Sequence, residues 1–135
     1  MTPDETLRAL AALEAGFKRD DQALAALARR APDEPGLPVL VADFGVLTLD
    51  TLVLLASGLA GRPEADEFLR TNVTARMCAA LGRTWTGWAA GADDGASGEI
   101  ARAVIDGILS FTEGAGEQHV LPLLAALRDQ ALQGD

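Results

Sequence analysis

The best candidates for a metal-binding or acid–base site are Asp43 and Asp50, two acids seven residues apart in an apolar stretch. Paired carboxylates can hold a metal ion or act as a general acid and base. On one helix, however, residues seven apart share a face but lie about 10.5 Å apart along the axis. They therefore need partners from other helices to share a proton or an ion. We expect them to be exposed, or paired in the core with Arg70, Arg76 or Arg102.

A second candidate is the segment that contains Arg83, Trp85 and Trp88. The chain has only six aromatic residues, yet both tryptophans fall within four positions. Trp and Arg are enriched at binding hot spots because they bury large areas and keep a polar group available. The alternative is that both indoles cover the hydrophobic core. We expect this segment to lie in a Gly-rich loop from Gly82 to Gly98 and to contact a partner or ligand.

Other chemical motifs are weak. The acids from Asp93 to Glu99 lack the spacing of a calcium loop and are explained by helix initiation. His119 is the only histidine, and the glycines between it and Glu113 give no rigid face for a zinc site. Cys78 has the pattern of a small core residue. No phosphate loop or dinucleotide fingerprint is present, and we expect no metal, no cofactor and no catalytic residue.

Composition narrows the classes of partner. The 135-residue chain has a formal net charge of −9, which opposes binding to nucleic acid and to anionic membranes. Hydrophobic residues make up 49% and the mean hydropathy is +0.16, which is high for a small protein and favours burial against another subunit. A single cysteine excludes an internal disulfide framework. The N-terminus lacks a signal-peptide pattern, so we expect a cytoplasmic protein.

The elements that must position these residues are organised around one apolar segment, Leu37 to Gly61, which has no basic residue and two acids. We expect one helix from about Pro38 to Leu59. Its apolar residues face almost every direction, so we expect protein to cover it on all sides. About 20 residues suffice to span a membrane, but two aspartates in the middle cost roughly 5–7 kcal/mol. We therefore expect no membrane span.

Apolar residues at helical spacing predict five further helices. Thr2, Pro3 and Glu5 form a helix start, and Gly16 is the expected end of that helix. The others are expected near residues 20–30, 63–81, 100–111 and 120–132. We find no repeat and no second domain. The sequence thus predicts an all-α fold, a single-domain bundle (1–135) of about six helices around the central apolar helix.

The leading functional hypothesis is a non-enzymatic interaction or regulatory protein, a homodimer that also binds another protein. It follows from the apolar excess, the acidic surface and the absence of converging catalytic residues. The alternative is a small-molecule-binding bundle or minor enzyme, with a pocket between helices walled by Phe44, Leu47 and Trp88 and with Asp43 or Asp50 as the polar contact. An acidic mimic of nucleic acid is a third possibility, but the carboxylates are spread along the chain rather than set in rows.

Overall fold

The structure, a computed structural model, describes residues 1–29, 32–111 and 120–133. These residues form seven α-helices and one short 3-10 helix, with no strand among them. The helices are α1 (Pro3–Lys18), α2 (Asp21–Ala28), α3 (Leu37–Ser57), α4 (Ala65–Thr71), α5 (Val73–Gly91), α6 (Ser97–Leu109) and α7 (Val120–Gln133), and the 3-10 helix is η1 (Asp94–Ala96). The all-α prediction is confirmed.

The predicted start of α1 and the predicted extent of the apolar helix are confirmed. Thr2 and Glu5 form the capping box of α1: the Glu5 amide donates to the Thr2 hydroxyl at 3.1 Å, and the Thr2 amide donates to the Glu5 carboxylate at 2.9 Å. The apolar segment is one helix, α3, which begins after Gly36. It ends at Gly58, whose φ of 74° is a conformation that glycine adopts without strain. Both boundaries lie within two residues of the prediction.

Three predicted boundaries were wrong. Gly16 does not end α1. It lies buried where α1 crosses α6, and a Cβ on it would sit 2.7 Å from the Cβ of Ala101. The single helix expected over 63–81 is interrupted at Asn72, which is extended and caps α5 by accepting from the Ala75 amide at 3.1 Å. The Gly-rich loop is largely helical, because α5 continues to Gly91.

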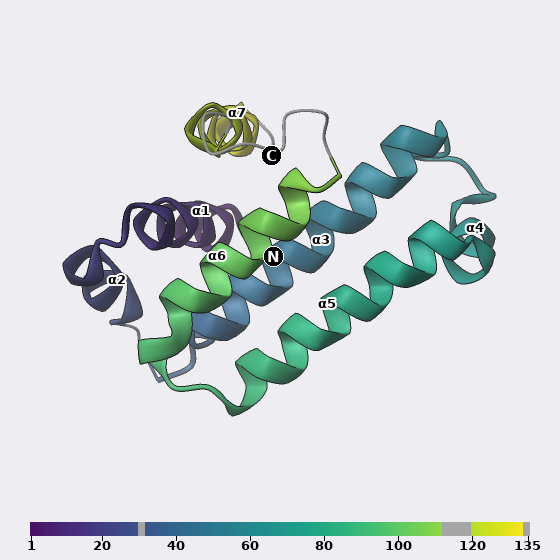
Figure 1. Cartoon of the computed structure of the whole chain (residues 1–135). Coiled ribbons are helices and arrows are strands. Elements are labelled where there is room, and N and C mark those ends of the chain that lie inside the picture. The colour runs from purple at the N-terminus through teal and green to yellow at the C-terminus, as the bar shows by residue number, and fades with distance from the viewer. Residues whose placement is uncertain (30–31, 112–119, 134–135) are drawn as a thin grey trace.

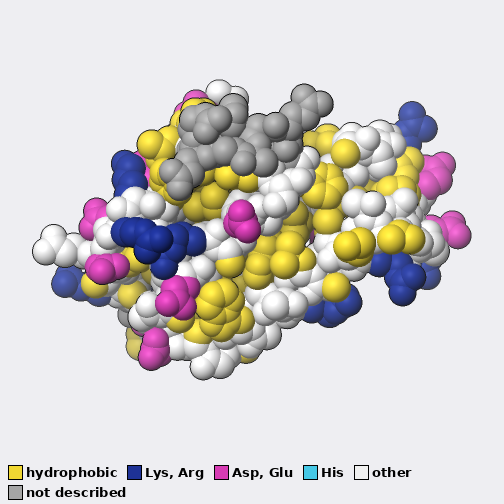
Figure 2. Space-filling view, in the orientation of Figure 1, with side chains coloured by type: hydrophobic (Ala, Val, Ile, Leu, Met, Phe, Trp, Pro, Cys, Tyr) yellow, Lys and Arg dark blue, Asp and Glu magenta, His cyan; other side chains and the backbone are white. Residues whose placement is uncertain are grey.

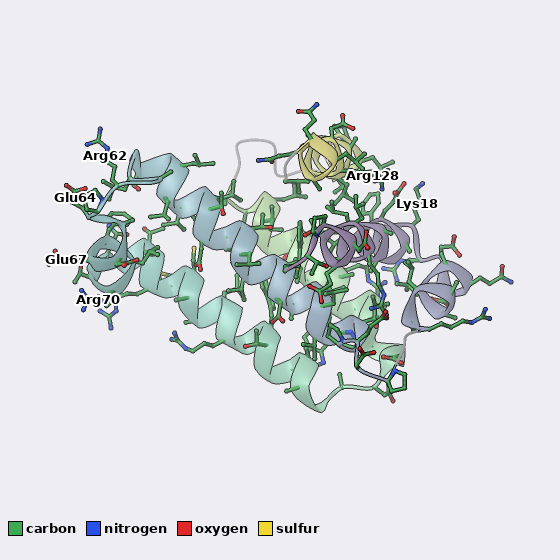
Figure 3. All side chains as sticks on the ribbon, turned by 180° about the vertical axis from the view of Figure 1, so that it is seen from behind. Lys18, Arg62, Glu64, Glu67, Arg70 and Arg128 are labelled. Atoms are coloured by element: carbon green, nitrogen blue, oxygen red, sulfur yellow. The ribbon has the colours of Figure 1, made fainter. Side chains whose placement is uncertain are left out.

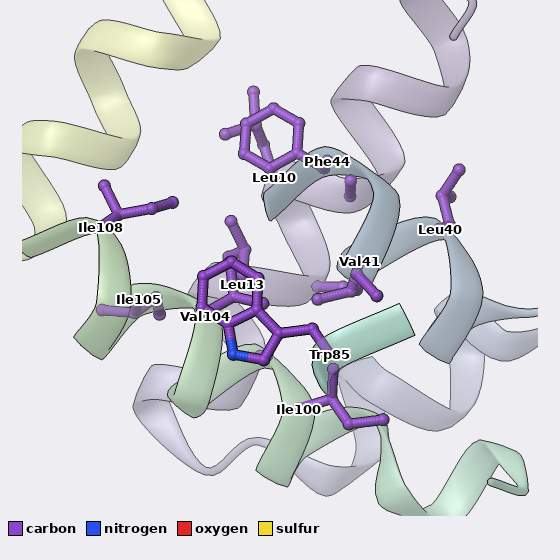
Figure 4. Packing of buried hydrophobic residues seen from close by; sticks show 14 of the residues in the cluster. Leu10, Leu13, Leu40, Val41, Phe44, Trp85, Ile100, Val104, Ile105 and Ile108 are labelled. Carbon is purple, nitrogen blue, oxygen red and sulfur yellow. The ribbon is translucent and has the colours of Figure 1, made fainter. Parts of the chain in front are cut away.

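The bundle is organised around α3, which packs against α1, α5 and α6. In Figure 1, α3, α5 and α6 run side by side, whereas α1 and α7 are viewed almost end-on and lie across them. Helix α1 also packs against α2 and α7, and the small α4 packs on the start of α5. The core therefore forms where α1 meets α3 and α6. Figure 4 shows Leu13 of α1, Val41 of α3 and Val104 of α6 gathered there around Trp85 of α5.

Helix α3 is not covered on all sides, which corrects the sequence-based expectation. Its first half carries core residues such as Leu37, Leu40 and Val41, but Leu47 and Leu55 are 51% and 60% exposed. In its most apolar window of 18 residues, 39% are buried within this chain, and the mean hydropathy is 2.1. It is the only helix in the described ranges long and apolar enough to cross a membrane. A core helix of a soluble bundle meets the same two criteria.

Candidate functional site

Trp85 is a core residue. Its side chain is 2% exposed and lies between α3 and α6 (Figure 4). Two glycines make room for the indole: a Cβ on Gly45 would lie 2.9 Å from Cζ3, and a Cβ on Gly107 would lie 2.5 Å from Cζ2. The ring therefore fills a slot that any larger residue at either glycine would close. Of the two roles weighed from the sequence, Trp85 has the one in which the indole packs in the core.

Trp88 and Arg83 lie on the surface of the same helix. Trp88 is 40% exposed and Arg83 is also exposed. Because α5 is helical here, Arg83 points away from both tryptophans, whereas Trp85 and Trp88, three residues apart, occupy neighbouring positions on the helix surface. Gly82 permits the helix to continue close to α3, since a Cβ on it would lie 3.0 Å from the Val46 side chain. The predicted three-residue recognition cluster is therefore divided between core and surface.

Asp43 and Asp50 do not form a pair. Asp43 is exposed and lines a groove with Glu5 and Thr86, whereas Asp50 is half-buried and acts electrostatically on Cys78. Burial raises the pKa of both carboxyl groups, and the Glu5 carboxylate adds to the rise at Asp43. Within the described ranges, neither carboxylate has a hydrogen bond or an ion pair.

None of the three arginines expected to pair with these acids contacts a carboxylate among the described residues. Arg102 donates to the carbonyl oxygen of Gly16 at 3.1 Å, and Nε of Arg70 donates to the carbonyl oxygen of Asp66 at 3.4 Å. Arg76 has no partner among the residues that the structure describes. Of the two alternatives weighed from the sequence, pairing with these arginines does not occur among the described residues, and exposure holds for Asp43. The exposed Asp43 and the half-buried Asp50 remain separate groups that could not share a proton or an ion.

A mostly apolar groove of about 480 Å³ lies between α1, α3 and α7, and we call it the α3 groove. Phe44 and Leu47, two of the residues predicted to wall a pocket, line it, but Trp88, Asp43 and Asp50 do not. Its other lining residues come from the N-terminus (Met1, Pro3, Thr6), from α3 (Thr48, Thr51, Leu52, Leu55) and from α7 (Leu127, Gln130, Ala131). The predicted pocket is thus present in part, with α7 where Trp88 was expected.

A second groove, of about 570 Å³, lies between α4 and α5, and we call it the arginine groove. Arg70, Arg76 and Arg83 line it together with five apolar residues, Leu69, Val73, Met77, Ala79 and Ala80. Dark blue arginine side chains lie along this edge of the molecule in Figure 2, at its lower right, and Figure 3 shows Arg70 projecting outward from α4. Of these three arginines, the sequence interpretation gave a binding role only to Arg83, and it named Arg70 and Arg76 as possible partners of Asp43 and Asp50. A signal was present: residues 68–92 contain three arginines and no acid.

The remaining candidates give no site. The described ranges hold no group of three or more His, Cys, Asp or Glu side chains that could bind a metal ion. His119, Glu113 and Glu117 lie outside those ranges. Cys78 is half-buried, and burial together with Asp50 raises the pKa of its thiol, so the thiol stays protonated at neutral pH. No family model, curated protein or solved structure matches this chain.

Proposed function

We propose that the protein is a non-enzymatic interaction protein that forms a homodimer through the exposed half of α3. The observation that carries this proposal is the stripe formed by Leu47, Thr51 and Leu55. These residues are spaced four apart, so they lie one above another on the helix surface. Both leucines are more than half exposed and border the α3 groove. An apolar stripe beside an apolar groove is what subunit contacts bury.

A second copy is the occupant that suits this stripe. The stripe is symmetric about Thr51, so an antiparallel copy of α3 places Leu47 of each chain against Leu55 of the other. A two-fold axis beside Thr51 generates this contact from a single surface. The small Thr51 side chain lets the two helices approach closely. Because each chain has a net charge of −9, the dimer has to overcome repulsion, and added salt strengthens it.

The test is the mass in solution, measured by light scattering after size-exclusion chromatography. We expect twice the 14.0 kDa of one chain for the wild type. Leu55→Glu puts a charge into the contact, so that variant should elute as a single chain. Val73→Glu is the matched control, because it changes an equally exposed residue on α5. A wild type that stays monomeric as salt rises, or a control that dissociates as fully as Leu55→Glu, refutes the proposal.

A second candidate function, binding of a small apolar molecule, is favoured by the α3 groove itself. Its volume of about 480 Å³ is within the range of ligand sites, and Thr48 and Gln130 offer polar contacts in a mostly apolar lining. Neither tryptophan lines it, so a thermal-shift assay is a better probe than tryptophan fluorescence. If decanol raises the melting temperature of the wild type but not of Leu47→Glu, and the wild type is monomeric, the small-molecule function replaces the dimer.

A further inference from the structure

The arginine groove combines the two most exposed large hydrophobic residues of the described chain with positive charge that forms no ion pair. Val73 and Met77 are 67% and 68% exposed. Arg76 and Arg83 are seven residues apart on α5, so they share one face at an axial separation of about 10.5 Å. Arg70 approaches from α4. The groove therefore offers apolar contact area with cations along its side.

The charge of this region is opposite to that of the rest of the molecule. The whole chain has 20 acidic and 11 basic residues, but residues 68–92 contribute three of the basic ones and none of the acidic ones. The ion pairs within the described ranges use Arg8, Lys18 and Arg128, all outside the arginine groove. Arg76 and Arg83 are thus exposed and form no ion pair with the described residues, and the acids of α4, Asp66 and Glu67, lie in the first turn of that helix. A negatively charged partner would gain from this local field.

We propose that the arginine groove binds an acidic amphipathic helix of another protein. Apolar side chains of that helix, spaced i, i+3/i+4 and i+7, enter between α4 and α5 and cover Val73 and Met77. Carboxylates seven residues apart on its flank meet Arg76 and Arg83, whose guanidinium groups can bind them in bidentate fashion. This inference goes beyond the α3 dimer and does not depend on it, because the two grooves share no residue.

Other occupants fit the groove less well. A bilayer is flat, whereas this surface is hollowed between two helices, and a net charge of −9 opposes an anionic membrane. Nucleic acid meets the same repulsion. A second copy would have to present a different, acidic surface to the groove, and such a head-to-tail contact generates open chains rather than a closed dimer. A helix from another protein can place leucines against Val73 and Met77 and glutamates beside Arg76 and Arg83.

The test uses a fluorescein-labelled helical peptide of about 18 residues, which is five turns. It carries leucines on one face and glutamates on both flanks. A second peptide has lysine in place of every glutamate, and fluorescence anisotropy with the full-length protein gives the dissociation constants. We expect the glutamate peptide to bind at least about tenfold more tightly than the lysine peptide. Raising the salt from about 50 to about 300 mM should weaken its binding, because charges near the surface are screened.

Matched variants locate the site. Arg76→Glu should weaken binding of the glutamate peptide by about tenfold or more, since it replaces attraction by repulsion. Arg29→Glu makes the same change of charge at an exposed residue outside the groove and should leave the affinity nearly unchanged. Val73→Glu should weaken the peptide complex while the mass measured by light scattering stays unchanged. Salt therefore separates the two proposals, because it strengthens the α3 dimer and weakens the peptide complex.

Three results overturn the inference. The first is no binding of the glutamate peptide, or equal binding of both peptides. The second is an equal loss of affinity in Arg76→Glu and Arg29→Glu, which would show that only net charge matters. The third is binding of phosphatidylserine vesicles, lost in Arg76→Glu, without binding of the glutamate peptide, which would assign the arginines to a lipid surface. A monomeric wild type that still binds the glutamate peptide through Arg76 refutes the dimer alone.

Discussion

The indole of Trp85 occupies the space in which a side chain of Gly107 would lie. A Cβ on Gly107 would be 2.5 Å from Cζ2 of the ring and 2.8 Å from Cη2, well inside the contact distance of two carbon atoms. Trp85 belongs to α5 and Gly107 to α6, so the missing side chain of Gly107 makes room for the indole between the two helices. The large side chain of Trp85 and the absence of a side chain at Gly107 are complementary in the packing of the core.

Gly107→Ala should therefore destabilise the protein although alanine is the better helix former. Overpacking a filled core costs about 1–3 kcal/mol, which exceeds the gain of about 1 kcal/mol in helix propensity. The matched control is Gly87→Ala in α5, where a Cβ would meet no atom within 4 Å. That control should stabilise by about 0.5–1 kcal/mol. Chemical denaturation measures both, and a stabilising Gly107→Ala would contradict the packing.

The coupling of the two residues can be measured directly. In Trp85→Phe the shorter ring leaves room beside Gly107, so adding Gly107→Ala to that variant should cost less than adding it to the wild type. The difference defines an interaction free energy, for which neighbouring core residues give about 0.5–3 kcal/mol. Equal costs in both backgrounds would show that the two residues are not coupled.

Local signals in the sequence predicted the helix types and most helix starts, because caps and prolines act within a few residues. The capping box at Thr2 and the break before Leu37 are examples. The same logic failed at Gly82. Gly82 was assigned to a loop, but it lies in a helix against Val46. What a helical glycine does depends on the residue across the helix interface, and a single sequence does not show which residue that is.

The candidate sites were predicted even less completely, for a related reason. Phe44 and Leu47 could be expected to line a cavity from their place on the apolar helix. The arginine groove depends on the interruption at Asn72, which turns α4 against α5 and brings Arg70 beside Arg76. The expected helix over 63–81 would have continued straight through that position. The absence of acids over residues 68–92 was visible, but the groove that gives this charge a binding surface was not.

Ser97 yields a prediction because its hydroxyl is buried without a partner. The side chain is 1% exposed at the start of α6, and its Oγ makes no hydrogen bond to the described residues. An unsatisfied buried hydroxyl costs about 1–3 kcal/mol, so Ser97→Ala should raise the free energy of unfolding by about 1 kcal/mol. Ser57→Ala is the control, since Ser57 is exposed and its hydroxyl donates to the carbonyl oxygen of Leu54. A loss of stability in Ser97→Ala would mean that the hydroxyl is hydrogen-bonded.

Glu14 of α1 forms ion pairs with Lys18 of the same helix and with Arg128 of α7, and these pairs predict a dependence of stability on pH. Glu14 accepts from Lys18 at 2.9 Å and from Arg128 of α7, and these contacts hold the pKa of its carboxyl below the usual value. The stabilisation is present above pH 4.5 and is lost as the pH falls through the lowered pKa. Glu14→Gln should therefore cost about 0.5–1 kcal/mol at pH 7 and progressively less under acid. If Glu14→Gln lowers the free energy of unfolding equally at every pH, the loss comes from packing rather than from the ion pairs.

Asp50 should show the opposite dependence on pH. Burial raises the pKa of its carboxyl above 3.8, so the folded protein binds this proton more tightly than the unfolded chain does. The folded state is therefore favoured below pH 3.8, and that advantage is lost as the pH rises through the raised pKa.

Asp50→Asn removes the half-buried charge and should raise the melting temperature at pH 7 but not at a pH well below 3.8. Asp33→Asn, in an exposed loop, removes the same formal charge and separates burial from the general repulsion within an acidic chain. Thermal unfolding at both pH values measures the difference. An equal gain in the two variants would show that net charge, rather than the position of Asp50 on α3, limits stability.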